Sequence, residues 1–400
     1  MTDRRVTDLD VSASKPSVTA VGGFVPPPYP YDRLDPMRKA AAAYEGGAID
    51  LSIGTPSDAP PPAALTALAN SGTERGYPPS IGSTTLRQAA CGWMARRFGV
   101  TVYPEQVASC MGTKEFVAQS AGWLKLRDPR RDTVLYPAVS YPTYAMGATL
   151  AGCRAVAVPV DTQWRLDLTQ VDPADVARAL CLWVNTPANP TGALDDLAAV
   201  AAWGRSHGVP VLSDECYIEF TWRGPPRTIL ESGCDGVLAL HSLSKRSNLA
   251  GLRVGFYAGD PELVSYLREV RKHAGFMVAG PVQAAASAAL DDDGHVDVQR
   301  RQYQHRLRVV ADAFGLLGTE VVLPDGTFYL WFSAPGGDSW AFAASLAERY
   351  GVLVAPGDLY GPAGAGYVRA AMVIGDAATE AIVRRFGRYS TTGGQPGRNI

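Results

Sequence analysis

A short segment near the middle of the chain carries the residue types of a covalent cofactor site. The apolar run 237–240 is followed by Ser242, Ser244 and Lys245, and Arg253 comes eight residues after the lysine. A lysine at the carboxyl end of a core strand can form a Schiff base with an aldehyde cofactor. The two hydroxyls and the arginine could then hold a phosphate on that cofactor. A surface lysine after a strand is the alternative for this segment taken alone.

Two other predicted strands end in polar segments that could complete such a site. Residues 182–184 are followed by Asn-Thr-Pro-Ala-Asn-Pro-Thr-Gly at 185–192, and residues 211–213 are followed by Asp214 and Tyr217. In open α/β sheets, ligands bind beyond the carboxyl ends of the strands. Singly, Asn-Pro-Thr-Gly is also a good turn and an aspartate after a strand is often a helix cap. Together, the three strand ends predict one site for pyridoxal phosphate (PLP).

The elements that must position these residues alternate between short apolar runs and helical patterns. We expect strands over residues 133–136, 155–160, 182–184, 209–213, 236–241 and 253–258, and helices over 194–206 and 261–274. Another helix should begin with Ser83 as its N-cap and bury an apolar face of Leu86, Ala89, Ala90, Trp93 and Met94. This alternation predicts an α/β fold with a parallel sheet covered on both faces. The helix over 261–274 is expected to end this layer.

The limits of the alternation predict the domain organisation. Residues 1–33, which include the Pro-rich run 25–30, are expected to form a mobile or extended N-terminal arm. Residues 34–55 would belong to a small domain and a linker, and 56–290 to a large PLP-binding domain. Residues 291–390 predict a smaller α+β domain of a helix, strands over 320–323 and 327–333, a helix, a strand and a final helix. Residues 391–400 are expected to form a disordered tail.

The composition argues against several classes of function. A formal net charge of −2 and a pI of about 6.2 predict no binding surface for nucleic acid or anionic membrane. No apolar stretch approaches the ~20 residues of a membrane helix, and the N-terminus lacks the apolar region of a secretory signal. The six cysteines form no C-x-x-C pair, which favours reduced core thiols, no metal site and a cytoplasmic location. Cys216 is interpreted as a packing residue rather than a nucleophile.

The motifs N-x-x-x-N-P-T-G, D-x-x-Y and S-x-S-K-x7-R occur in this order, at 185–192, 214–217 and 242–253. They resemble the class I/II aminotransferases of PLP fold type I. The resemblance covers roughly residues 34–388, and the ordered set of motifs is highly specific. It implies a large, mostly parallel-sheet α/β domain and a smaller α+β domain. It also implies pyridoxal 5'-phosphate as cofactor, amino acids and 2-oxo acids as substrates, and a homodimer with shared active sites.

The resemblance implies a role for each candidate residue around the cofactor. Lys245 would form the Schiff base and move a proton from Cα to C4′, while Asp214 would keep the pyridine nitrogen protonated. Asn189 and Tyr217 would donate to the phenolic oxygen O3′. Tyr141 would stack on the ring face, with a strand-end core aromatic as the alternative. Phosphate contacts would come from a strand-to-helix turn and from the central segment, through Thr113, Lys114, Ser242, Ser244 and Arg253.

Three further residues are assigned from the resemblance to the substrate and to a partner subunit. The backbone of Gly54 would approach the substrate, and Asn189 would also contact it. Arg369 would clamp the substrate α-carboxylate, a bidentate task that lysine cannot copy. Tyr77 would reach the phosphate of the neighbouring subunit, and a local core tyrosine is the alternative. The segment 326–331 is expected to line the substrate pocket.

Within the family, the segments 241–251, 271–275, 281–285 and 355–361 are similar to the actinobacterial succinyldiaminopimelate aminotransferases. This implies amino transfer between glutamate and an N-succinyl amino-keto dicarboxylate in lysine biosynthesis. The long Pro-rich arm and the segments 109–111 and 217–220 depart from that branch. A specialised-metabolism relative catalysing elimination, γ-substitution or cyclisation is therefore an alternative. A PLP-sensing regulator would need a DNA-binding helix-turn-helix domain, and only about thirty patternless residues precede this fold.

Overall fold

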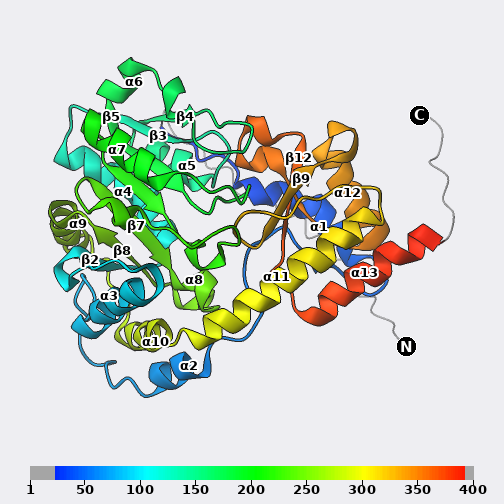
Figure 1. Cartoon of the computed structure of the whole chain (residues 1–400), viewed down its shortest axis with the longest axis horizontal. Helices are drawn as coiled ribbons and strands as arrows, with labels where there is room; N and C mark the ends of the chain where they lie inside the picture. Colours follow the sequence, from blue (N-terminus) through cyan, green and yellow to red (C-terminus); the bar gives the residue numbers. More distant parts are fainter. Residues whose placement is uncertain (1–22, 392–400) are drawn as a thin grey trace, which may run out of the picture.

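The computed structural model describes residues 23–391 of the 400-residue chain (Figure 1). Residues 1–22 of the predicted arm and 392–400 of the predicted tail lie outside the described residues. Figure 1 shows a larger body built around one sheet and a smaller body that contains the first and last helices, α1 (Asp35–Ala42) and α13 (Asp376–Thr391).

A seven-stranded sheet forms the centre of the larger body. Its strands are β2 (Val107–Cys110), β3 (Thr133–Pro137), β4 (Arg154–Val158), β5 (Ala179–Asn185), β6 (Val211–Asp214), β7 (Val237–Ser242) and β8 (Gly255–Gly259). They lie in the order β2-β8-β7-β6-β5-β3-β4. The α/β fold and mostly parallel sheet are confirmed, but β8 runs antiparallel to both β2 and β7. This strand reverses because the short α8 (Leu243–Arg246) and a loop turn the chain back directly, without the long crossover that a parallel pair needs.

Helices cover both faces of this sheet. One face packs in a cluster with α2 (Pro62–Ala69), α3 (Thr84–Phe98), α7 (Leu197–His207) and α10 (Gly280–Asp291), and the other with α4 (Thr113–Arg127), α5 (Thr143–Leu150) and α9 (Pro261–His273). The short α6 (Pro173–Ala177) precedes β5. Leu182 and Val184 of β5 face the first cluster, whereas Cys181 and Trp183 face the second. This alternation is the period of two that a strand imposes on its side chains.

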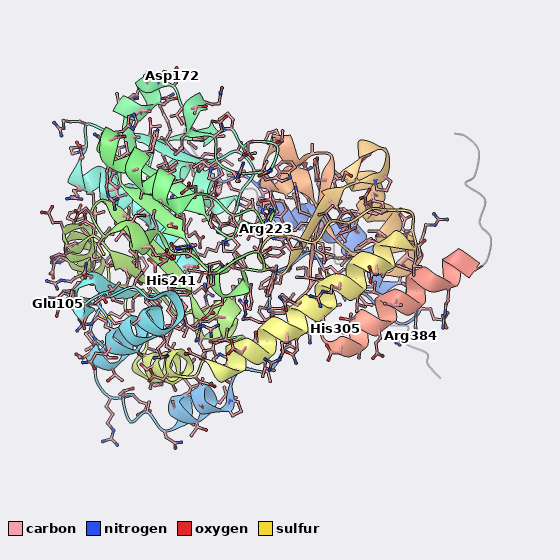
Figure 2. The ribbon with its side chains drawn as sticks, viewed as in Figure 1. Glu105, Asp172, Arg223, His241, His305 and Arg384 are labelled. Carbon is pink, nitrogen blue, oxygen red and sulfur yellow. The ribbon has the colours of Figure 1, made fainter. Side chains whose placement is uncertain are left out.

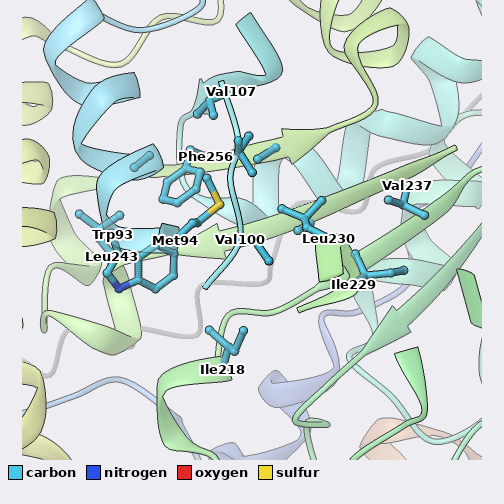
Figure 3. Close-up of a cluster of buried hydrophobic side chains, with 14 of the residues drawn as sticks. Trp93, Met94, Val100, Val107, Ile218, Ile229, Leu230, Val237, Leu243 and Phe256 are labelled. Carbon is cyan, nitrogen blue, oxygen red and sulfur yellow. The ribbon is translucent and has the colours of Figure 1, made fainter. Parts of the chain in front are cut away.

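The helix predicted at Ser83 forms as expected. The Ser83 hydroxyl accepts a hydrogen bond from the backbone N–H of Leu86 at 3.2 Å, which caps α3. All five residues predicted for its apolar face are buried. Figure 3 shows two of them, Trp93 and Met94, packed beside Phe256 of β8.

The layer does not end at the helix predicted over 261–274, which forms as α9. The next helix, α10, packs against α2 and α3 and places Ala285, Ala286 and Ala289 in the same core cluster. Its small side chains allow close approach to neighbouring helices, but they give a weak apolar pattern in the sequence. The sequence interpretation was therefore wrong about where this layer stops.

The smaller body is an antiparallel sheet with helices around it. The sheet order is β11 (Ala355–Pro356), β12 (Tyr367–Ala371) and β9 (Tyr329–Ser333), and β1 (Ile49–Asp50) pairs in parallel with β10 (Val352–Leu353). The helices are α1 (Asp35–Ala42), α11 (Gly294–Gly315), α12 (Ser339–Tyr350) and α13 (Asp376–Thr391). Leu34, Met37 and Leu51 share one core cluster with Phe314 and Phe386. The numerical domain boundaries stay a prediction.

One predicted strand is absent from this body. Residues 320–323 have no regular structure, and Val322 and Leu323 are 73% and 45% exposed. The β-branched residues suggested a strand, but Pro324 follows immediately and lacks the N–H that a central strand needs. No helix within residues 23–391 is both long enough and apolar enough to cross a membrane.

Candidate active site

A cavity of about 370 Å³ lies where β5, β6 and β7 end and the smaller body meets the sheet. This edge is the expected ligand position, because β3 and β4 extend the sheet in one direction and β5 to β7 in the other. Twelve of the thirteen predicted site residues line the cavity. They are Gly54, Thr113, Lys114, Tyr141, Asn189, Asp214, Tyr217, Ser242, Ser244, Lys245, Arg253 and Arg369.

Lys245 points into this cavity from α8, directly after β7. Its ammonium donates a hydrogen bond to the carbonyl oxygen of Gly54. Desolvation by the surrounding protein lowers the pKa of Lys245 to about 8, and the charges of Arg369 and Arg253 act in the same direction. The ammonium still predominates near pH 7, but the neutral amine is far more populated than in a solvent-exposed lysine. Only the neutral amine can attack an aldehyde carbon, so this environment favours Schiff-base formation.

Asp214 is the buried anion of the cavity, at the end of β6. One carboxylate oxygen accepts a hydrogen bond from the Tyr144 hydroxyl at 2.7 Å, and the other accepts from the backbone N–H of Cys216 at 3.3 Å. Burial raises the pKa of Asp214, and these hydrogen bonds oppose part of that rise. A cation placed against the carboxylate would compensate for its desolvation. The sequence interpretation did not identify Tyr144 as its partner.

A neighbouring carboxyl, Glu215, points away from the cavity into the core. Its Oε1 accepts from the Ser213 hydroxyl at 2.9 Å, and its Oε2 lies 3.7 Å from Nε2 of His241. Figure 2 shows His241 inside the larger body. Burial raises the pKa of Glu215 to about 7 and lowers the pKa of His241 to about 3. Of these two adjacent carboxyls, Asp214 is therefore the one available to a ligand in the cavity.

A chain of hydrogen bonds links the Asn-Pro-Thr-Gly segment to the smaller body. The backbone N–H of Asn189 donates to Oδ1 of Asn185 at 2.7 Å. Nη1 of Arg369 then donates to Oδ1 of Asn189 at 2.8 Å. Since its oxygen is engaged by Arg369, the amide NH2 is the group that Asn189 can offer to a ligand. Asn185 also lines the cavity.

Arg369 is rigidly held on β12. Its Nη2 donates to the carbonyl oxygen of Ser52 at 2.6 Å, and the side chain is buried. The guanidinium carbon lies 4.2 Å from the ring centre of Tyr329 and 4.8 Å from that of Tyr360. Aromatic faces attract cations, so the two rings and the acceptors fix both the position and the plane of the guanidinium.

A glycine and an arginine shape one end of the cavity. Gly112 has φ of +75° and precedes α4, which begins at Thr113. A Cβ on Gly112 would collide with the Arg253 guanidinium, so only glycine lets this turn approach the arginine closely. The Ser242 hydroxyl accepts from the backbone N–H of Ser244 at 3.2 Å and keeps its own proton to donate. Helix N–H groups, hydroxyls and a guanidinium are suitable donors for a phosphate.

Cys216 lies at the same end of the cavity, and its side chain is a protonated thiol. Its Sγ donates to the Thr113 hydroxyl at 3.4 Å. Burial holds the pKa of Cys216 well above its ordinary value, which opposes a nucleophilic role. All six cysteines are free.

Tyr77 is the predicted site residue that lies elsewhere. Its side chain is 98% exposed and does not line the cavity. The alternative of a local core tyrosine is therefore wrong. A fully exposed tyrosine in the single chain is compatible with a contact made to another subunit.

The sequence interpretation missed a contribution from the N-terminal segment. Tyr29, Tyr31, Asp32 and Arg38 line the cavity, and all four come from the segment just before α1 or from α1 itself. The Tyr29 hydroxyl accepts a hydrogen bond from Nζ of Lys114 at 3.2 Å. The Pro-rich run shows no periodicity, so the sequence predicts an arm for residues 29–33 and no part in the site. The aromatic residues that alternate with the prolines were the available signal.

The cavity has a complement for every functional group of PLP. Lys245 could react with an aldehyde, and the buried carboxylate of Asp214 could pair with a protonated ring nitrogen. Donors for a phenolic oxygen come from Asn189 and Tyr217, and the Gly112 turn with Arg253 offers a cradle for a phosphate. The fold and this cavity define a PLP-dependent enzyme of fold type I.

Comparisons with known proteins agree with this class. Residues 47–386 match the family model of aminotransferase class I and II, and the chain belongs to this family. It is 43% identical over 360 residues to the 4-dedimethylamino-4-oxo-anhydrotetracycline transaminase OxyQ of Streptomyces rimosus, covering 88% of this chain and 96% of that protein. It is 44% identical over 370 residues to a probable aminotransferase of Mycobacterium tuberculosis, covering 90% and 85%. A probable N-succinyldiaminopimelate aminotransferase from Thermus thermophilus superimposes with a TM-score of 0.80 at 32% identity, covering 90% of this chain and 100% of that one.

Proposed function

We propose that this transaminase moves an amino group between glutamate or 2-oxoglutarate and a second amino or keto acid. The observation that carries the proposal is Arg369, which lines the same cavity as Lys245. A buried, oriented guanidinium is suited to bind the α-carboxylate that both substrates share. The substrate amine would then be held near the lysine, where amino transfer takes place.

In this proposal the predicted site residues have defined roles toward the cofactor. PLP, when bound, withdraws electrons from the substrate Cα and stores the amino group between the two halves of the reaction. Lys245 would be the base that moves a proton between Cα and C4′. Asp214 would hold the proton on the ring nitrogen, and Tyr217 and Asn189 would donate to the phenolic oxygen. Tyr141 would pack against the ring face.

The remaining contacts would anchor the cofactor and border the substrate. The phosphate is bound by donors from two segments, namely Thr113, Lys114, Ser242, Ser244 and Arg253. The carbonyl oxygen of Gly54 accepts a hydrogen bond from Lys245. The backbone of Gly54 would therefore border a substrate whose amine lies near the lysine. These contacts orient the reacting atoms before the proton moves.

For the second substrate we propose an N-succinyl-diaminopimelate-type amino acid of lysine biosynthesis. The similarity to the Thermus thermophilus structure supports it. Tyr29 and Tyr31 line the cavity with ring centres 5.7 Å apart, and this aromatic surface favours a second candidate from specialised metabolism, a bulkier ketone. The similarity to OxyQ, whose name describes a tetracycline-type substrate, points the same way. Comparing initial rates with succinylated and polycyclic keto acceptors separates the two.

We further propose that the enzyme works in the cytoplasm as a homodimer with shared active sites, in which Tyr77 reaches the phosphate of the neighbouring subunit. The exposure of Tyr77 supports this arrangement. Light scattering of active enzyme is expected to give twice the chain mass, and Tyr77→Phe should weaken cofactor retention without lowering the melting temperature. An active monomer at assay concentration would reject the shared site.

Arg369→Ala is expected to damage both halves of the reaction, because both substrates carry an α-carboxylate. Losing one member of a buried, hydrogen-bonded charge pair should lower kcat/KM by about 10²–10³-fold for each substrate. In the wild type, glutamate should bleach the visible absorbance of the bound cofactor and 2-oxoglutarate should restore it.

A matched control is Arg385→Ala in the same body. Arg385 is also buried, but its guanidinium donates to the backbone carbonyls of Tyr350 and Gly46. This variant should lose stability while leaving KM for glutamate unchanged. Equal losses in the two variants, or a wild type that shows no response to glutamate, would contradict the proposed function.

A further inference from the structure

Tyr329 contacts three residues of the proposed site, namely Tyr217, Arg369 and Gly54. It lies on β9, and its hydroxyl is 2.9 Å from the hydroxyl of Tyr217, with both groups buried. Its ring packs against the Arg369 guanidinium at 4.2 Å. Its hydroxyl also fills the space beside Gly54, where an added Cβ would collide with it. Its position is fixed from the backbone side, because its N–H donates to the Thr327 hydroxyl at 3.1 Å.

The direction of the hydrogen bond between the two tyrosines follows from counting protons. Each hydroxyl has one proton, and the 2.9 Å contact can use either of them. Under the proposed function, Tyr217 gives its proton to the phenolic oxygen of PLP. Tyr217 then has no proton left for Tyr329, so Tyr329 must donate the hydrogen bond and Tyr217 must accept it.

We propose that Tyr329 is a positioning residue that donates to Tyr217 and so strengthens the hydrogen bond of Tyr217 to the phenolic oxygen. This inference rests on the proposed function, which supplies the role of Tyr217. Hydrogen bonds in a chain polarise one another, and the effect is larger in a buried site. The same ring supports Arg369, so one side chain connects the cofactor contact with the carboxylate clamp.

In the holoenzyme the phenolic oxygen would share a proton with the nitrogen of Lys245. The Tyr329 hydroxyl should change the pH at which this proton is lost. A hydrogen bond to the oxygen draws negative charge away and weakens its hold on that proton. Removing the Tyr329 hydroxyl weakens the bond from Tyr217, so the oxygen regains charge. The shared proton should then be lost only at higher pH.

The test is a pH titration of the visible absorbance of the substrate-free holoenzyme. Tyr329→Phe should raise the midpoint by about 0.5–1 pH unit, the size expected for one hydrogen bond. Tyr217→Phe, which removes the direct donor, should raise it further. A purely structural role of Tyr329 would change the melting temperature but would not move this midpoint.

Tyr360→Phe is the matched control. Tyr360 is also buried and also packs against Arg369, but its hydroxyl contacts the hydroxyl of Tyr31 at 2.9 Å instead of Tyr217. Its midpoint should stay at the wild-type value. In the double variant Tyr217→Phe/Tyr329→Phe, the second change should add no further shift, because it acts only through the first.

The inference is overturned if Tyr217→Phe shifts the midpoint and Tyr329→Phe does not, because Tyr217 would then donate to Tyr329. It is also overturned if the two shifts add, or if Tyr217→Phe itself has no effect. The proposed function is judged separately, by the response of the wild type to glutamate. If Tyr329→Phe shifts the midpoint but the wild type does not respond to glutamate, the hydrogen bond from Tyr329 to Tyr217 is supported and the glutamate reaction is rejected.

Discussion

Lys245→Ala should lower the rate of amino transfer by at least about 10⁴-fold, because one side chain both attaches the cofactor and moves the proton. Folding should be little affected. The substitution removes an ammonium whose pKa is already lowered to about 8 by desolvation, and its hydrogen-bond partner is the carbonyl oxygen of Gly54. The variant should retain cofactor through noncovalent contacts but lose any link that borohydride can reduce. Mass spectrometry of reduced protein measures this directly.

Lys125→Ala is the control for that experiment. Lys125 lies on α4, and its ammonium donates to the carbonyl oxygens of Ala151 and Gly152. This variant should keep both the reducible adduct and full activity. Detection of the adduct on a lysine other than Lys245 in the wild type would remove the basis for the assignment.

Asp214→Asn should have the second-largest effect. The amide keeps the shape of the side chain and can still meet Tyr144 and the backbone of Cys216, but it carries no charge for the ring nitrogen. Loss of a charge-assisted partner should weaken cofactor binding by ~1.5–3 kcal/mol. The loss in kcat should be about 10²–10³-fold, because charge develops on the ring during the reaction. Equilibrium dialysis and steady-state kinetics separate the two effects.

Asp195→Asn provides a comparison at a second, partly buried aspartate. Asp195 accepts from the Thr186 hydroxyl at 3.0 Å and from the backbone N–H of Leu166 at 2.7 Å, outside the cavity. Burial raises the pKa of Asp195 to about 6. This variant should alter stability and leave kcat near the wild-type value. Near-normal turnover of Asp214→Asn would show that Asp214 is a structural cap.

The carboxyl ends of β5, β6 and β7 could be predicted because each apolar run stops at a polar residue with distinct chemistry. That local signal was sufficient to gather Asn189, Asp214 and Lys245 in one cavity. It could not reveal that Tyr144 donates to Asp214, because the contact joins residues that are 70 positions apart and depends on how α5 packs.

The errors have the same origin in contacts that periodicity does not encode. Tyr29 and Tyr31 lie in a segment without regular pattern, yet Lys114 and Tyr360 hold them at the cavity. The antiparallel direction of β8 depends on a short connection, and an apolar strand has the same pattern in either direction. The run at 320–323 had strand propensity, but propensity is weak when Pro324 limits pairing.

The confinement of Arg369 has an entropic consequence for substrate binding. A mobile arginine side chain has ~2 kcal/mol of rotamer entropy, most of which is lost when the guanidinium is immobilised by a ligand. Here Asn189, Ser52 and the two flanking rings immobilise it before any ligand arrives. The rotamer entropy is therefore lost when the protein folds, and an incoming carboxylate does not have to order the side chain. If the full ~2 kcal/mol is saved, the dissociation constant is about thirtyfold lower than for an equivalent but mobile arginine.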